Sequence, residues 1–153
     1  MSALSILLEK NHHQTRQVLR RVIDLLKGDL YARTIAVLGL AFKPGTSDVR
    51  NSLAVRIIER LQRQGAMIHA YDPAAQAEAQ QVLPGVLLFD TPSAAAQGGH
   101  LVLVLTGWEE FRHLDLERLR VAVARPNLVD GVNVLDPAAA KRAGFIYQGV
   151  GRH

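Results

Sequence analysis

Apolar residues follow two patterns along the chain, continuous runs and helical periodicity. Residues 35–40 (IAVLGL) and 101–105 (LVLVL) are continuous apolar runs, which are typical of strands buried on both faces of a sheet. Between these runs, apolar residues from Ala54 to Leu61 recur at i, i+3, i+4 and i+7, the spacing of one face of an α-helix. The pattern therefore predicts buried strands separated by amphipathic helices.

Strands and helices are predicted to alternate after an initial helix. Helices are expected at 4–27, 54–64, 74–82, 91–97, 114–123 and 137–142, and strands at 35–40, 67–71, 86–89, 101–105, 128–129 and 145–148. Regular alternation of this kind produces a parallel sheet with helices on both faces. The expected fold class is therefore α/β, a three-layer sandwich with a mostly parallel Rossmann-like sheet, preceded by an N-terminal helix.

The helix expected at 4–27 precedes the first strand, so it cannot be a crossover between strands. Its apolar stripe includes Val18, Val22 and Leu25, and Gly28 ends it as a C-terminal cap. The stripe needs a surface that covers it, and large exposed apolar patches usually mark interfaces. We therefore expect a homodimer formed through residues 4–27.

Composition indicates one globular domain and excludes several classes of protein. The chain has 153 residues, of which 48% are hydrophobic, and this is enough for one full core. Cysteine is absent, so disulfides are excluded and a cytoplasmic protein is the default expectation. No apolar run is long enough to span a bilayer, so no membrane association is expected. The net charge of +4 is spread along the chain, which favours a small acidic ligand such as a nucleotide over nucleic acid.

A polar, tightly bent segment follows the first predicted strand. Residues 39–52 read GLAFKPGTSDVRNS and contain one lysine and one arginine, Lys43 and Arg50. Ligands of open α/β sheets bind at the carboxyl ends of strands, where this segment is expected. It matches neither common nucleotide fingerprint. Ala41 stands where G-x-G-x-x-G needs a glycine, and Thr46 stands where G-x-x-x-x-G-K-[ST] needs a lysine.

Other interpretations of these polar residues stay open from the residues alone. The segment could be a solvated crossover in which Asp48 or Ser52 caps the following helix. Asp72 and Pro73, after the second strand, fit the start of a helix, although an acid at this place could also hold a ribose hydroxyl. We expect capping, because no glycine fingerprint precedes Asp72. Trp108, after the fourth strand, is expected to be a packing residue rather than a platform for a base.

Short motifs follow successive predicted strands in a characteristic order. They are residues 39–52, 70–73 (AYDP), 108–112 (WEEFR), 129–131 (VDG) and 149–152 (GVGR). Together they resemble the C-terminal, UDP-binding domain of the UDP-glucose/GDP-mannose dehydrogenase family. The resemblance extends from about Asn11 to Arg152, which is nearly the whole chain, and a signature spread over five strand ends is highly specific.

The resemblance implies roles for particular residues. Phe42 and Lys43 match family positions that contact the nucleotide-sugar, and Arg50 matches one that faces the cofactor side of the cleft. Asp130 begins a segment that in the family commonly reads Asp-Gly-Arg-Asn. Here Val132 replaces the arginine, which in the family reaches the nucleotide-sugar. The implied ligand is UDP or a UDP-sugar.

The resemblance also implies a division of the chain and of the chemistry. Residues 1–28 correspond to the end of a linking and dimerisation helix, and residues 29–153 to a nucleotide-sugar-binding α/β domain. In the resembling enzymes, an N-terminal domain binds NAD and a catalytic cysteine takes part in the oxidation of the sugar. The present 153 residues contain neither the NAD fingerprint nor a cysteine. We therefore expect no catalytic residue, no cofactor and no dehydrogenation in this chain alone. The adjacent His12 and His13 point to different faces, so no metal is expected either.

Three hypotheses follow. The first is a UDP-sugar-binding domain of a UDP-glucose 6-dehydrogenase-like enzyme. The second is a degenerate copy kept for folding and association, with ligand binding lost at Val132. The third is an ordinary NAD-binding Rossmann domain, which the missing glycine fingerprint disfavours.

Overall fold

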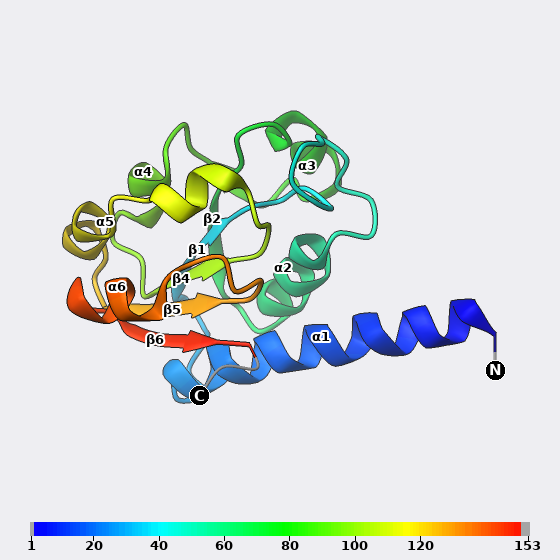
Figure 1. Cartoon of the computed structure of the whole chain (residues 1–153), viewed down its shortest axis with the longest axis horizontal. Helices are drawn as coiled ribbons and strands as arrows, with labels where there is room; N and C mark the ends of the chain where they lie inside the picture. The colour runs from blue at the N-terminus through cyan, green and yellow to red at the C-terminus, as the bar shows by residue number, and fades with distance from the viewer. Residues whose placement is uncertain (1, 151–153) are drawn as a thin grey trace.

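The computed structural model describes residues 2–150 and has three layers, with a sheet between two layers of helices (Figure 1). The elements are α1 (Ala3–Leu25), β1 (Thr34–Leu38), α2 (Leu53–Arg63), β2 (Met67–Tyr71), α3 (Gln76–Val82), β3 (Leu87–Leu88), α4 (Pro92–Ala96), β4 (Leu101–Val104), the 3-10 helix η1 (Glu109–His113), α5 (Leu116–Ala122), β5 (Asn127–Asp130), α6 (Pro137–Arg142) and β6 (Ile146–Gly149). All strand pairs are parallel, and their order is β3-β2-β1-β4-β5-β6. The predicted fold class is confirmed, and the strand order reverses between β1 and β4.

The two faces of the sheet carry separate apolar cores. Ile35 and Val37 of β1 face a core built with α1, α2 and α3, whereas Ala36 and Leu38 face a core built with α4, α5 and α6. All four of these side chains are completely buried. A strand that is covered on both faces has no solvated side, which explains its unbroken run of apolar residues.

Helix α1 packs differently from the sequence-based expectation. Val18 and Val22 are completely buried in the chain's own core, and Leu25 packs against the same core. The argument that this stripe needs a second subunit is therefore wrong, because the stripe lies over α2 and β5 of its own chain. The amino-terminal part of α1 extends beyond the sheet (Figure 1), and there Leu4 and Ile6 are exposed. The boundary at residue 28 stays a prediction, but the packing joins α1 and the sheet in one core.

Two helices begin two residues later than the sequence pattern predicts. Helix α3 begins at Gln76 because the two preceding residues form a turn whose N–H groups are hydrogen-bonded to Asp72. The helix expected from residue 114 begins at Leu116, after the separate 3-10 turn η1. Within that turn Phe111 is completely buried, and its N–H donates to the carbonyl of Trp108 (3.0 Å).

Gly39 allows the carboxyl ends of β1 and β4 to lie close together. Its φ is +101°, and a Cβ atom at this position would lie 2.5 Å from the backbone nitrogen of Thr106. The hydroxyl of Thr106 in turn donates to the carbonyl of Ala41 (2.8 Å). The hydrogen bond from Thr106 joins the loop after β1 to the segment after β4. The close approach of the two segments leaves no room for a side chain at position 39.

We expect Gly39→Ala to lower the free energy of unfolding by roughly 2–5 kcal/mol, because left-handed backbone strain and steric overlap add together. Gly28→Ala is the matched control, since Gly28 also has a positive φ (+76°) but no atom within 4 Å of the added Cβ. The control should lose only the backbone part, roughly 1–2 kcal/mol. Urea titrations of both variants measure the difference, and equal losses would contradict the steric contribution of Thr106.

Candidate functional site

The loop between β1 and α2 is folded back on itself by its own backbone and side chains. The N–H of Phe42 donates to the carbonyl of Asp48 (2.7 Å), and the N–H of Asp48 donates to the hydroxyl oxygen of Thr46 (3.1 Å). Phe42 is 55% exposed and Lys43 is exposed as well. Both predicted ligand residues therefore lie on the surface beside the reversal of strand order, where open α/β sheets bind ligands. Their contact with a ligand stays a prediction.

Asp72 lies directly after β2, is 3% exposed and receives five hydrogen bonds. Its Oδ2 accepts from the N–H groups of Leu40 (2.7 Å) and Ala41 (3.0 Å) and from the indole N–H of Trp108 (3.0 Å). Its Oδ1 accepts from the backbone N–H groups at positions 74 and 75, both at 2.8 Å. One carboxylate thus connects the end of β1, the end of β4 and the turn before α3.

The structure corrects the expectation that Asp72 caps the next helix. The N-cap of α3 is Ala75, which makes no side-chain cap hydrogen bond. The alternative role in ribose binding fits poorly too, because both oxygens of Asp72 already accept hydrogen bonds inside the protein. Trp108 is half-buried and packs against both apolar cores, so the packing role expected for it is confirmed.

The second half of the loop holds a charged pair and a helix cap. The guanidinium of Arg50 donates to both carboxylate oxygens of Asp48, from Nε at 3.1 Å and from a terminal nitrogen at 3.0 Å. These hydrogen bonds lower the pKa of Asp48 and raise the pKa of Arg50. Ser52 accepts from the N–H of Val55 (3.0 Å) and caps α2, so of the two candidate caps Ser52 is the one used. Arg50 remains 86% exposed despite its pairing, and its role toward a cofactor stays a prediction.

Asp130 and Val132 lie at the carboxyl end of β5. Asp130 is completely buried; its Oδ1 accepts from the N–H of Val132 (3.2 Å) and its Oδ2 from the N–H of Leu135 (2.7 Å). Direct contact between Asp130 and a ligand stays a prediction, and this burial favours a role in shaping the turn. The side chain of Val132 is half-buried and packs against both cores.

The topology brings these segments together along one edge of the sheet. Strands β1, β4 and β5 are neighbours, so the loops that follow them start side by side. A Cβ atom on Gly107 would lie 3.9 Å from Cγ of Pro44, which places the first loop directly beside the segment after β4. The predicted residues 42, 43, 130 and 132 therefore belong to this carboxyl edge, and Arg50 lies further along the first loop.

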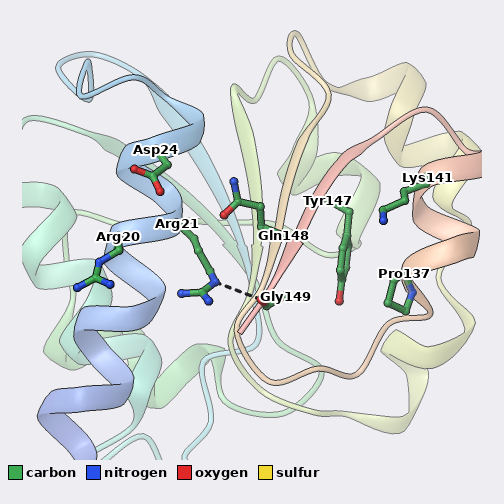
Figure 2. A pocket seen from close by; sticks show the side chains of 8 residues that line it. All are labelled: Arg20, Arg21, Asp24, Pro137, Lys141, Tyr147, Gln148 and Gly149. Carbon is green, nitrogen blue, oxygen red and sulfur yellow. Dashed lines mark hydrogen bonds between the residues drawn. The ribbon is translucent and has the colours of Figure 1, made fainter. Parts of the chain in front are cut away.

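A separate hollow of about 390 Å³ lies where α1, α6 and β6 meet (Figure 2). Arg21 reaches from α1 to β6, where its Nε donates to the carbonyl of Gly149 (3.1 Å) and its Nη1 donates to the carbonyl of Gln17 (3.0 Å). Tyr147 lies between β6 and α6, beside Pro137 (Figure 2). None of the predicted ligand residues lines this hollow. Sequence reasoning missed it because Arg21 and Gly149 are 128 positions apart, and no local pattern links them.

Three further points concern the last motif, metal binding and membrane helices. The motif at 149–152 is described only as far as Val150, and its last two residues lie outside the described range. Within residues 2–150, no group of three or more His, Cys, Asp or Glu side chains is arranged to hold a metal ion. No helix in the same range combines the length and hydropathy needed to cross a bilayer.

Comparisons with known proteins agree on one family. The family model described as "UDP-glucose/GDP-mannose dehydrogenase family, UDP binding domain" matches residues 36–137. The chain is 37% identical over 149 residues to a UDP-glucose 6-dehydrogenase of Pseudomonas aeruginosa, an alignment that covers 94% of this chain and 33% of that protein. It superposes with a TM-score of 0.79 on a UDP-glucose dehydrogenase from Pyrobaculum islandicum, at 32% identity, covering 95% of this chain and 31% of the other. The chain thus spans about a third of the length of the curated relatives it matches.

A more distant likeness concerns the fold alone. A D-isomer specific 2-hydroxyacid dehydrogenase from Lactobacillus delbrueckii, solved in an NAD complexed form, superposes with a TM-score of 0.63 at 12% identity. The match covers 92% of this chain and 49% of that one. The same architecture is therefore found in a dehydrogenase of a different substrate class.

Proposed function

Because this chain belongs to the UDP-glucose/GDP-mannose dehydrogenase family as a UDP-binding domain, we propose that it holds a UDP-sugar at the carboxyl edge of its sheet. Membership of the family confirms the resemblance found in the sequence. The whole protein that contains this domain would be an NAD-dependent oxidoreductase of the UDP-glucose 6-dehydrogenase type. Within it, the present chain supplies part of the surface that binds the substrate.

The exposed pair Phe42 and Lys43 beside the reversal of strand order carries this proposal. The ammonium group of Lys43 is a mobile point charge that suits the phosphate oxygens of a nucleotide. The ring of Phe42 offers a flat apolar surface that suits a base or a sugar face. The loop that carries both residues is held by Asp72 and Thr106, so the two groups are presented from a fixed backbone.

NAD does not fit the first strand-to-helix turn of this chain. The N–H groups of Leu40 and Ala41, which would face a phosphate there, already donate to Asp72. We therefore assign the cofactor to the remainder of the whole protein and propose that Arg50 faces it from the outer part of the loop. The chain alone has no proposed catalytic residue and is expected not to reduce NAD.

Association is the second candidate function, and the exposed end of α1 favours it. Leu4 and Ile6 are 65% and 51% exposed on the part of the helix that extends beyond the sheet. Apolar side chains in such a position suit helix-to-helix contact with a second copy. The proposed homodimer then uses the beginning of α1 within residues 4–27, rather than the buried stripe of Val18 and Val22.

Lys43→Ala should weaken UDP binding about tenfold, because it removes one charge-assisted contact with the ligand. Lys10→Ala, an exposed lysine on α1, is the control for the change in net charge and should leave UDP binding unchanged. Calorimetric titration of both variants with UDP, UDP-glucose and NAD measures the effect. Tighter binding of NAD than of UDP by the unmodified chain would overturn the assignment of the ligand.

Val132→Arg should tighten binding of a UDP-sugar by roughly tenfold to a hundredfold, which corresponds to about 1.5–3 kcal/mol of charge-assisted hydrogen bonding. The gain should shrink as salt is added, since the new contact is electrostatic. Val121→Arg is the matched control, because Val121 is 85% exposed on α5, away from the carboxyl edge. A folded Val132→Arg variant that binds no better would favour the association function.

The chain should be a dimer by light scattering at high micromolar concentration. Replacing both Leu4 and Ile6 with glutamate should weaken dimerisation more than tenfold, because charge replaces apolar surface at the contact. Val121→Glu, on a surface outside α1, should leave the dimer intact. A monomeric unmodified chain, or a double variant that dimerises equally well, would exclude this interface.

A further inference from the structure

The first strand-to-helix turn of this chain has the backbone arrangement of an anion site, and the protein's own carboxylate fills it. Gly39, Leu40 and Ala41 stand where a dinucleotide-binding domain has the start of its glycine fingerprint. The N–H groups of Leu40 and Ala41 point at one oxygen of Asp72, at 2.7 and 3.0 Å. In a dinucleotide domain, N–H groups at this turn receive the phosphate of the ligand.

The helix terminus that usually completes such a phosphate site is also displaced. Strand β1 ends at Leu38, whereas α2 begins only at Leu53, so a long loop separates the turn from the helix. At the start of α2, the N–H of Val55 donates to the hydroxyl oxygen of its cap Ser52 (3.0 Å). The N–H groups of the turn are thus already committed, and α2 does not follow the turn directly as the helix of a dinucleotide domain does.

We propose that Asp72 is a specificity-determining residue that acts as an internal anion, excluding phosphate from the first turn and positioning the loop that carries Phe42 and Lys43. The same carboxylate that satisfies the turn also accepts from the indole of Trp108 (3.0 Å), which fixes the turn relative to the end of β4. Anionic ligands are thereby directed away from the turn and toward the exposed side of the loop. The positioning of Phe42 and Lys43 rests on the proposed function, whereas the exclusion of phosphate does not.

The surroundings of Asp72 support exclusion. A hollow of about 330 Å³ next to it is lined by Tyr71, Asp72 and Asp90 among others, and its charged side chains are acidic. The hydroxyl of Tyr71 donates to Glu110 (2.9 Å), and burial, together with Glu110 and Asp72, raises the pKa of Tyr71 to about 12. A phosphate brought to this side of the turn would meet negative charge and no uncommitted turn N–H.

Chemical rescue tests the internal anion directly. Asp72→Ala should lower the melting temperature by about 10 °C, because several charge-assisted hydrogen bonds are lost and their donors stay buried. Added formate or inorganic phosphate should restore at least half of that loss by occupying the vacated turn, at ionic strength matched with sodium chloride. Asp90→Ala is the matched control, because Asp90 lines the same hollow but is exposed. These anions should stabilise the Asp72→Ala variant more than this control or the unmodified chain, because in the latter two Asp72 still fills the turn.

The outcomes separate the inference from the proposed function. The inference that Asp72 acts as an internal anion would be overturned by an Asp72→Ala variant with an unchanged melting temperature. It would also be overturned if the anions stabilised the unmodified chain as much as that variant. If Asp72→Ala folds under no condition, Asp72→Asn decides, since it keeps the volume and removes the charge. The Asp72→Asn variant should have a lower melting temperature that formate does not raise, and it should bind UDP about tenfold more weakly. An unchanged melting temperature would overturn the inference. An unmodified chain that binds no UDP defeats only the proposed function, because melting and rescue need no nucleotide.

Discussion

A buried carboxylate is tolerated only where hydrogen bonds replace those it makes with water. In this protein the hydrogen bonds to Asp72 hold three separate segments together. Its five donors come from the turn after β1, from Trp108 after β4 and from the turn before α3. Removing the charge would leave several backbone N–H groups buried without partners. The position of the loop that carries Phe42 and Lys43 therefore depends on a residue that is itself almost completely buried.

Asp130 repeats this arrangement on the other side of the strand-order reversal. It is completely buried and accepts from the backbone N–H groups of Val132 and Leu135 at the end of β5. Both carboxylates are used inside the protein to shape loops, whereas Lys43 and Arg50 lie on the surface. The carboxyl edge thus combines internally satisfied anions with an exposed lysine and an arginine paired with Asp48, which suits the anionic ligand proposed above.

The two halves of helix α1 differ in their surroundings. Its second half buries Val18 and Val22 against the same core as β1 and α2, which makes it part of the α/β unit. Arg21 adds a contact with the carbonyl of Gly149 on the edge strand β6. Its first half extends past the sheet with Leu4 and Ile6 exposed, so this part is open to contact with a second subunit.

The sequence by itself determined the succession of strands and helices along the chain and the parallel three-layer fold, because hydrophobic patterning depends on residue type and local spacing. The family was indicated separately, by the resemblance of the short motifs at the strand ends. The sequence also located the loop of Phe42 and Lys43 at the carboxyl edge. What covers the stripe of α1, and which groups surround Asp72, were decided only by the tertiary structure. Leu40 and Asp72 are 32 positions apart, and Asp72 and Trp108 are 36 apart. An aspartate before a proline has the same local sequence whether it caps a helix or fills a distant turn, and only the folding of β1, β2 and β4 side by side brings those donors to its carboxylate.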